Sequence, residues 1–227
     1  MYEIVYDRFS CINYLHYKED SSLTPIIPIN TTSCYKMFYD CCTLIQLDLS
    51  NFDTSNVVNM YCMFSDCKSL TQIDLSNFDT SKVINMRGMF YHCKVLIQLD
   101  LSHFDTSKVT TMYCMFCRCE ALTQLDISSF NTSQVTNMCY MFSYCSNLAS
   151  LDLSSFNISK VNDIEEMFYD CKKLTAIYIS DKWKTNSVIY SDNMFKKCYS
   201  LSNFNQENTD IEMAKPVEEG GYLTLKN

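Results

Sequence analysis

Among the side chains of this 227-residue chain, those of the 14 cysteines could do the most kinds of chemistry, because a thiol can ligate a metal, form a disulfide or act as a nucleophile. Half of them recur at a nearly constant spacing, at positions 41, 67, 93, 119, 145, 171 and 198. If successive repeats stack, their Cβ atoms point the same way and lie about 4.8 Å apart, beyond the usual ~3.8 Å of a disulfide. We therefore expect seven free thiols that pack as small apolar side chains.

The other seven cysteines, at positions 11, 34, 42, 62, 114, 117 and 139, share no column. Cys114 and Cys117 form a C-x-x-C pair with Cys119 close by, but the sequence offers neither a second pair nor a nearby histidine to complete a zinc site. We predict no metal site and no cofactor. A thiol redox or metal protein is kept as a third hypothesis.

A second regular set is acidic and consists of Asp48, Asp74, Asp100, Asp126 and Asp152. Each stands between two apolar residues of a strand-like motif, so these carboxylates are expected to face outward on adjacent strands. At about 4.8 Å in water, neighbouring charges repel by roughly 0.9 kcal/mol. Two interpretations stay open: a solvated face inherited by duplication, or a strip that binds a cation or another ligand.

Catalytic chemistry has little support in the sequence. Histidine occurs only at positions 16, 92 and 103, and no Ser-His-Asp or Cys-His motif surrounds any of them. Gly-rich phosphate loops are missing from a chain with only 3 glycines. The sequence therefore predicts that the protein is not an enzyme, and no catalytic or cofactor-binding residue is assigned.

A tandem repeat must position these residues. The pair Met-Phe occurs at 37, 63, 89, 115, 141, 167 and 194, so five of the six gaps are 26 residues and the last is 27. Residues 44–201 are predicted to form the repeat array, residues 1–43 a degenerate N-terminal cap, and residues 202–227 a C-terminal cap whose Gly-Gly-Tyr-Leu-Thr-Leu adds a closing strand.

Each repeat contains two periodicities. Alternation over residues 72–76 predicts a short strand with Ile73 and Leu75 buried, whereas apolar residues three and four apart over 83–93 predict a short helix. The polar run at 79–81 suits a turn. The expected fold is therefore an α/β solenoid, a right-handed leucine-rich-repeat-like array of strand-turn-helix coils with a continuous parallel sheet. Its interior should hold an aromatic column formed by Phe52, Phe78, Phe104, Phe130 and Phe156.

Two columns on the predicted helix side vary between repeats and are therefore expected to face solvent. One contains Tyr61, Arg87, Tyr113, Cys139 and Glu165, and the other contains Asp66, His92, Arg118, Tyr144 and Asp170. The column of Met60, Met86, Met112 and Met138 is instead predicted to fill the core.

The pattern LDLSNFDTSKV followed by NMxxMFxxC resembles the 26-residue repeat of BspA-type bacterial surface proteins, an atypical leucine-rich repeat. The resemblance covers about residues 44–198. It implies a protein of the cell surface or the extracellular space that acts in adhesion or binding. The N-terminus lacks the features of a signal peptide, so a cytoplasmic location stays open.

The expected partner is a protein or a glycan, bound by a monomer. A net charge of −8 argues against a nucleic-acid partner. The sequence contains no run of 18 apolar residues, so a membrane span is not predicted. The outward strand face, predicted to be nearly free of large apolar side chains, is the candidate binding face: Gln46, Asp48, Gln72, Asp74, Gln98, Asp100, Gln124, Asp126 and Asp152. The alternative is a structural spacer without a ligand.

Overall fold

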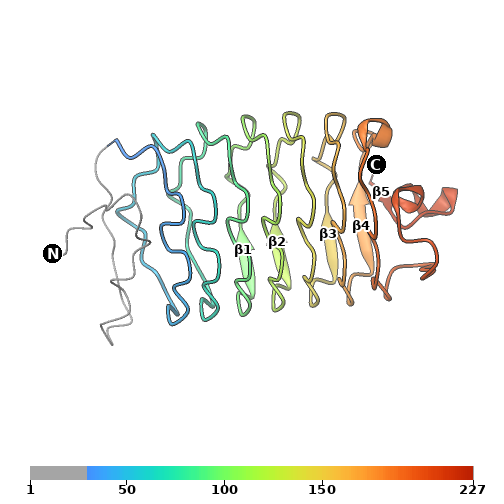
Figure 1. Ribbon diagram of the computed structural model, residues 1–227, viewed down its shortest axis with the longest axis horizontal. Coiled ribbons are helices and arrows are strands. Elements are labelled where there is room, and N and C mark those ends of the chain that lie inside the picture. Colours follow the sequence, from blue (N-terminus) through green and yellow to red (C-terminus); the bar gives the residue numbers. More distant parts are fainter. Residues whose placement is uncertain (1–29, 227) are drawn as a thin grey trace.

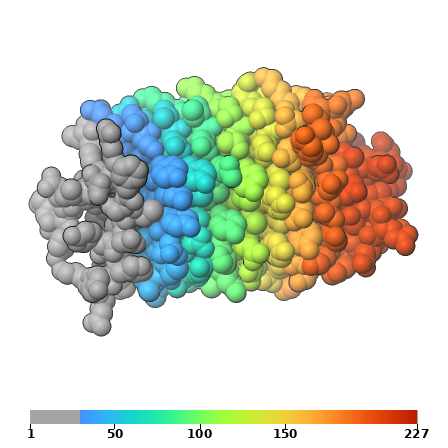
Figure 2. All heavy atoms as spheres, in the orientation of Figure 1, coloured from blue at the N-terminus to red at the C-terminus, as the bar shows by residue number. Residues whose placement is uncertain are grey.

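The computed structural model describes residues 30–226, which form a stack of coils that follow one another along the long axis (Figure 1). In the space-filling view, consecutive stretches of the sequence appear as adjacent bands across the molecule (Figure 2). Most of the predicted N-terminal cap, residues 1–43, lies outside the described residues, as do Cys11 and His16.

The core consists of columns of identical or similar side chains, one from each coil. The four methionines predicted as core filler are fully buried. A continuous stack of phenylalanine rings runs beside them, with successive ring centroids 5.4–5.9 Å apart and planes within 12° of parallel. Its members are Phe38, Phe64, Phe90, Phe116, Phe142, Phe168 and Phe195. Because each inner ring packs on rings of both neighbouring coils, the interior couples the coils to one another.

The second aromatic column, predicted from the sequence, is also buried in all five coils. Its rings stack at two steps, with centroids 5.7 Å apart for Phe52 and Phe78 and 6.2 Å apart for Phe130 and Phe156. In the next coil Trp183 takes the place of the phenylalanine and is likewise buried.

Short strands line one side of the stack (Figure 1). They are β1 (Gln98–Asp100), β2 (Gln124–Asp126), β3 (Ser150–Asp152), β4 (Ala176–Ile179) and β5 (Thr224–Leu225). Strands β1 and β2 form one parallel pair, and β3, β4 and β5 form a three-stranded parallel sheet. The C-terminal residues thus provide the predicted closing strand.

The prediction of one continuous sheet is wrong for the described residues. Residues 72–76 form no strand, and no pairing joins β2 to β3 within residues 30–226. With two to four residues to a strand, each pair is held by few backbone bonds, so the ladder is easily interrupted.

Continuity between coils comes from another side of the stack. Six parallel bridges join residues 26 or 27 positions apart, in the order Ser33, Asn59, Asn85, Thr111, Asn137, Asp163 and Tyr190. The side-chain oxygens of the three asparagines also accept the N–H two residues further on, at 3.0 Å, which fixes the local backbone.

The predicted helix is also wrong: residues 30–226 contain no α-helix, and this part of each coil is a ladder of tight turns. The N–H of Met89 donates to the carbonyl of Met86 at 3.2 Å, whereas the N–H of Phe90 donates to Met115 in the next coil at 3.0 Å. Since this alternation continues along the segment, every second N–H donates to a neighbouring coil. These N–H groups cannot form the hydrogen bonds of an α-helix.

Left-handed backbone positions maintain the turn ladder. Each coil has two residues with positive φ four positions apart, such as Cys114 (55°) and Arg118 (63°). A positive φ at the third position of a tight turn is what a type II turn requires, and it interrupts a right-handed helix. Successive turns begin two residues apart, at Met86, Gly88 and Phe90. The apolar side chains at 86, 89, 90 and 93 are nevertheless all buried.

Three short 3₁₀ helices accompany the C-terminal end: η2 (Thr185–Ser187), η3 (Ile211–Met213) and η4 (Val217–Glu219). Between η4 and β5, the buried Tyr222 ring packs edge-on against Phe195 at 5.3 Å. This aromatic contact closes the core at the last coil.

Candidate functional site

The outward strand face carries a shallow depression of about 450 Å³. Its polar lining consists of Gln46, Asp48, Gln72, Asp74 and Gln98, which are five of the nine predicted face residues. The structure therefore brings the N-terminal part of the predicted face together in one place.

The other four predicted residues continue the face along the stack. Register pairs Gln98 with Gln124 and Asp100 with Asp126, as predicted. Asp152, in β3, is half-buried rather than exposed, and its carboxylate accepts a hydrogen bond from the Lys226 ammonium. The C-terminal lysine thus partly neutralises that end of the acidic column.

Apolar side chains border this face, contrary to the prediction. Ile45 and Ile97, which directly precede Gln46 and Gln98, are 51% and 53% exposed. Ile73 is only partly buried and lines the depression, although it was predicted to be in the core. Ile45 and Ile73 lie in coils without a strand, and Ile97 directly precedes β1, so no pairing encloses these side chains.

The repeated aspartates have a structural role that the sequence analysis did not assign. In all five, Oδ1 accepts the backbone N–H of the serine two residues later, at 2.9–3.0 Å. Hydrogen bonds from Ser76 and Ser102 hold the pKa of Asp74 and Asp100 below its ordinary value. Turn formation therefore accounts for the repetition without any ligand.

A neighbouring column of aspartates and asparagines forms the same kind of turn, which was predicted for its residues 79–81. Asp53, Asp79 and Asp105 accept the N–H two residues later at 2.9 Å, and Asn131 and Asn157 do so at 3.1 and 3.0 Å. An amide therefore replaces a carboxylate here without loss of the turn.

All thirteen cysteines within residues 30–226 are free, as predicted for the regular column. Six thiols of that column, from Cys67 to Cys198, each donate to the phenylalanine carbonyl of the preceding coil at 2.9–3.2 Å. Burial raises the pKa of Cys119 and Cys198 to about 12. These thiols stay protonated at neutral pH, which makes them poor nucleophiles.

We expect an alkylating reagent to discriminate between the cysteines. Cys42 and Cys62 are partly exposed and should react in the native protein, whereas Cys93, Cys119 and Cys145 should react only after unfolding. Peptide mass mapping after a short iodoacetamide pulse, with and without urea, measures this. Equal labelling of both groups in the native state would contradict the buried column.

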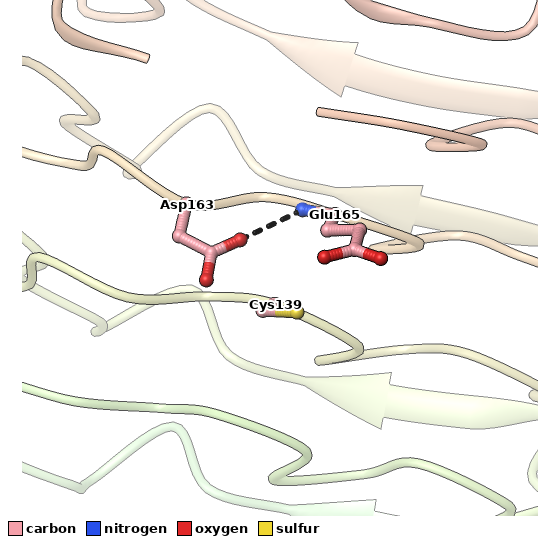
Figure 3. A group of neighbouring side chains, drawn as sticks. All are labelled: Cys139, Asp163 and Glu165. Atoms are coloured by element: carbon pink, nitrogen blue, oxygen red, sulfur yellow. Dashed lines mark hydrogen bonds between the residues drawn. The ribbon is translucent and has the colours of Figure 1, made fainter. Parts of the chain in front are cut away.

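A group of possible metal ligands, Cys139, Asp163 and Glu165, was missed by the sequence analysis (Figure 3). Their ligand atoms lie within 4.8 Å of one another, and no other such group occurs in the described part of the chain. One Asp163 oxygen accepts the N–H of Glu165 at 3.1 Å, and the other accepts from Asn137 at 2.9 Å. The sequence contained a sign of this group: Cys139 and Glu165 stand in a column whose other members are two tyrosines and an arginine.

The chemistry of this group argues against a preformed metal site. Burial and the nearby carboxylates raise the pKa of Cys139, so its thiol keeps its proton, whereas zinc takes a thiolate. Both oxygens of Asp163 already accept hydrogen bonds, which a metal would have to replace. The arrangement is thus accounted for by contacts between adjacent coils.

The two variable columns are not uniformly exposed. Cys139 and Asp170 are 3% and 5% exposed, which corrects the prediction for these two positions. Lys172 and Lys197 lie 3.0 and 3.8 Å from the Asp170 carboxylate and compensate the buried charge.

The two histidines in the described residues contact neighbouring coils. His92 Nδ1 lies 2.9 Å from Asp66 Oδ1, and His103 Nε2 lies 2.8 Å from the Leu75 carbonyl oxygen. Each ring therefore has a bonding partner that fixes its orientation in the stack.

Comparisons with known proteins link the chain to a described family. Residues 21–99 and 94–211 match the family model described as "Mycoplasma protein of unknown function, DUF285". A solved structure, the crystal structure of the T. pallidum leucine-rich repeat protein, matches over 75% of this chain and 70% of its own, with 18% identity and a TM-score of 0.37. No curated protein matches this chain. Within residues 30–226, no helix has the length and apolar character needed to cross a bilayer.

Proposed function

We propose that this chain, which belongs to the family described as "Mycoplasma protein of unknown function, DUF285", is a non-enzymatic repeat protein that binds a protein or glycan partner. The proposed architecture is a right-handed, leucine-rich-repeat-like solenoid of BspA type. Parallel bridges between residues 26 positions apart support it. The resemblance to surface-protein repeats supports a role in adhesion at the cell surface.

The observation that carries this proposal is the outward polar face with its depression of about 450 Å³. Asp74, Asp100 and Asp126 are exposed there, and none of them forms an ion pair within residues 30–226. Aligned, uncompensated carboxylates favour a cationic protein surface or a hydroxyl-rich glycan, in a contact that weakens as salt rises.

Replacing Asp74, Asp100 and Asp126 together by asparagine tests the face without breaking its turns. Asn131 and Asn157 show that an amide accepts the same backbone hydrogen bond. We expect the triple variant to keep its melting temperature and to lose about tenfold or more in affinity for cationic peptides or glycans that bind the wild type. Peptide and glycan arrays, read at about 50 and 300 mM salt, measure this.

A matched control removes the same charge elsewhere. Asp53, Asp79 and Asp105 make the same turns in the neighbouring column, and their replacement by asparagine should leave binding unchanged. Equal losses in both triple variants would show a general charge effect and sink the assignment of the face. Absence of binding to every probe favours the spacer.

A further inference from the structure

A second depression, of about 430 Å³, lies over Gly88 on the turn ladder, away from the acidic strand face. Gly88 occupies a left-handed position that carries Cys62 and Cys114 in the neighbouring coils. The space beside Gly88 is taken by the Cys62 sulfur, which would lie only 2.9 Å from a Cβ at this position. Tyrosines and two arginines surround the depression.

The two guanidinium groups are held by aromatic rings. The Arg87 guanidinium carbon lies 4.3 Å from the ring centroid of Tyr113 and 5.7 Å from that of Tyr61. That of Arg118 lies 4.6 Å from the centroid of Tyr144. Cation–π attraction restricts both side chains, yet neither has an acidic partner within residues 30–226. Their N–H groups are therefore positioned and available.

The same arrangement extends in both directions along the stack. Tyr35 stacks on Tyr61 at 5.0 Å, with Lys36 5.7 Å from the Tyr35 ring. Toward the other end, Lys197 lies 4.8 Å from the ring of Tyr169 and also 3.8 Å from the Asp170 carboxylate. Lys36 and Lys197 are six coils apart, or about 29 Å at ~4.8 Å per coil, which matches about nine residues of extended chain.

The residues in these contacts form a tyrosine–arginine strip: Tyr35, Lys36, Tyr61, Arg87, Tyr113, Arg118, Tyr144, Tyr169 and Lys197. We propose that this strip binds an extended acidic segment of a partner protein, whose carboxylates pair with Arg87 and Arg118. A guanidinium donates two parallel N–H bonds to a carboxylate. Tyrosine and arginine are also among the residues that dominate the energy of protein interfaces. Unpaired arginines on a chain of net charge −8 mark the strip as a local site for an anionic group.

The charge pattern disfavours a polyphosphate. Glu166 borders the depression, and the Glu165 carboxylate lies 3.4 Å from the Tyr140 hydroxyl beside it. Closely spaced phosphates would be repelled by these groups, whereas a peptide can place its carboxylates only where the arginines lie. An anionic glycan is the competing occupant and is resolved by the test.

The test uses an array of fluorescent nonapeptides with two to four Glu or Asp residues, and a matching array with Gln and Asn. We expect the wild type to select acidic members and Arg87→Gln/Arg118→Gln to lose about tenfold or more in affinity for them. Lys82→Gln/Lys108→Gln removes the same charge from exposed positions outside the strip and should change affinity less than about twofold. Arg87→Lys should give an intermediate loss, because it keeps the charge but not the fork.

Several outcomes would overturn the proposal. These are equal binding of the acidic and amide arrays, equal losses in the arginine and lysine variants, or tighter binding of a polyuronate oligosaccharide than of any acidic peptide. Melting curves of each variant exclude unfolding as the cause. The strand-face variant with asparagine at 74, 100 and 126 should bind the acidic peptides like the wild type, so the two surfaces can fail independently.

Discussion

Replacing Phe116 by alanine is expected to lower the free energy of unfolding by about 3–5 kcal/mol. The ring is fully buried and stacks on Phe90 at 5.9 Å and on Phe142 at 5.6 Å, so its loss leaves a cavity in the middle of the stack. Neighbouring coils are held in place by their own bridges, which limits their collapse into that space. Urea unfolding followed by circular dichroism measures the loss.

The control for this substitution is Tyr199→Ala. Tyr199 is 55% exposed and makes its ring contact with Phe204 near the C-terminal end. Its removal should cost less than about half as much, because no closed cavity forms. If both variants unfolded at the same urea concentration, the continuous aromatic stack would not be what stabilises the coils.

The second large effect is expected for Leu99→Ala in β1, at about 2–5 kcal/mol. Leu99 is 3% exposed and pairs in register with Leu125 of the next coil, so its cavity is flanked by coils on both sides. Leu225→Ala should cost about 0.5 kcal/mol or less, because Leu225 is 45% exposed in the terminal strand β5.

Measuring both leucine variants under identical conditions tests the stacked arrangement directly. A residue inside the array loses contacts with two neighbouring coils, whereas a residue at its end loses contacts with one. Similar losses at positions 99 and 225 would be inconsistent with the observed burial and with a stack that is capped at this end.

Local pattern was enough to predict the contents of the core and much of the turn chemistry. The spacing of the Met-Phe pairs identifies one apolar column after another, and the methionine column and the regular cysteine column are buried in the described coils. The register of Gln98 with Gln124 follows from the same repeat. These features depend only on which residues recur, because identical neighbours stack in columns.

The conformation of the turn ladder could not be obtained in this way. Apolar residues three and four apart are typical of a helix, yet the turn ladder buries the same side chains, so the pattern alone does not distinguish the two conformations. Hydrogen bonds to the next coil, such as Phe90 N–H to the Met115 carbonyl, decide between the two. Such bonds join residues that are distant in sequence, so the tertiary structure alone determines the outcome.

For the two candidate binding surfaces, too, the sequence revealed one part and the tertiary structure the other. Sequence alone identified the repeated aspartates, but only the tertiary structure shows that each accepts a backbone N–H, as Asp74 does from Ser76 at 2.9 Å. The tyrosine–arginine strip was visible only as two columns of changing residues. Its arginine–tyrosine contacts join adjacent coils within one column, as Arg87 does with Tyr113, and only the tertiary structure shows that the guanidinium lies over the ring.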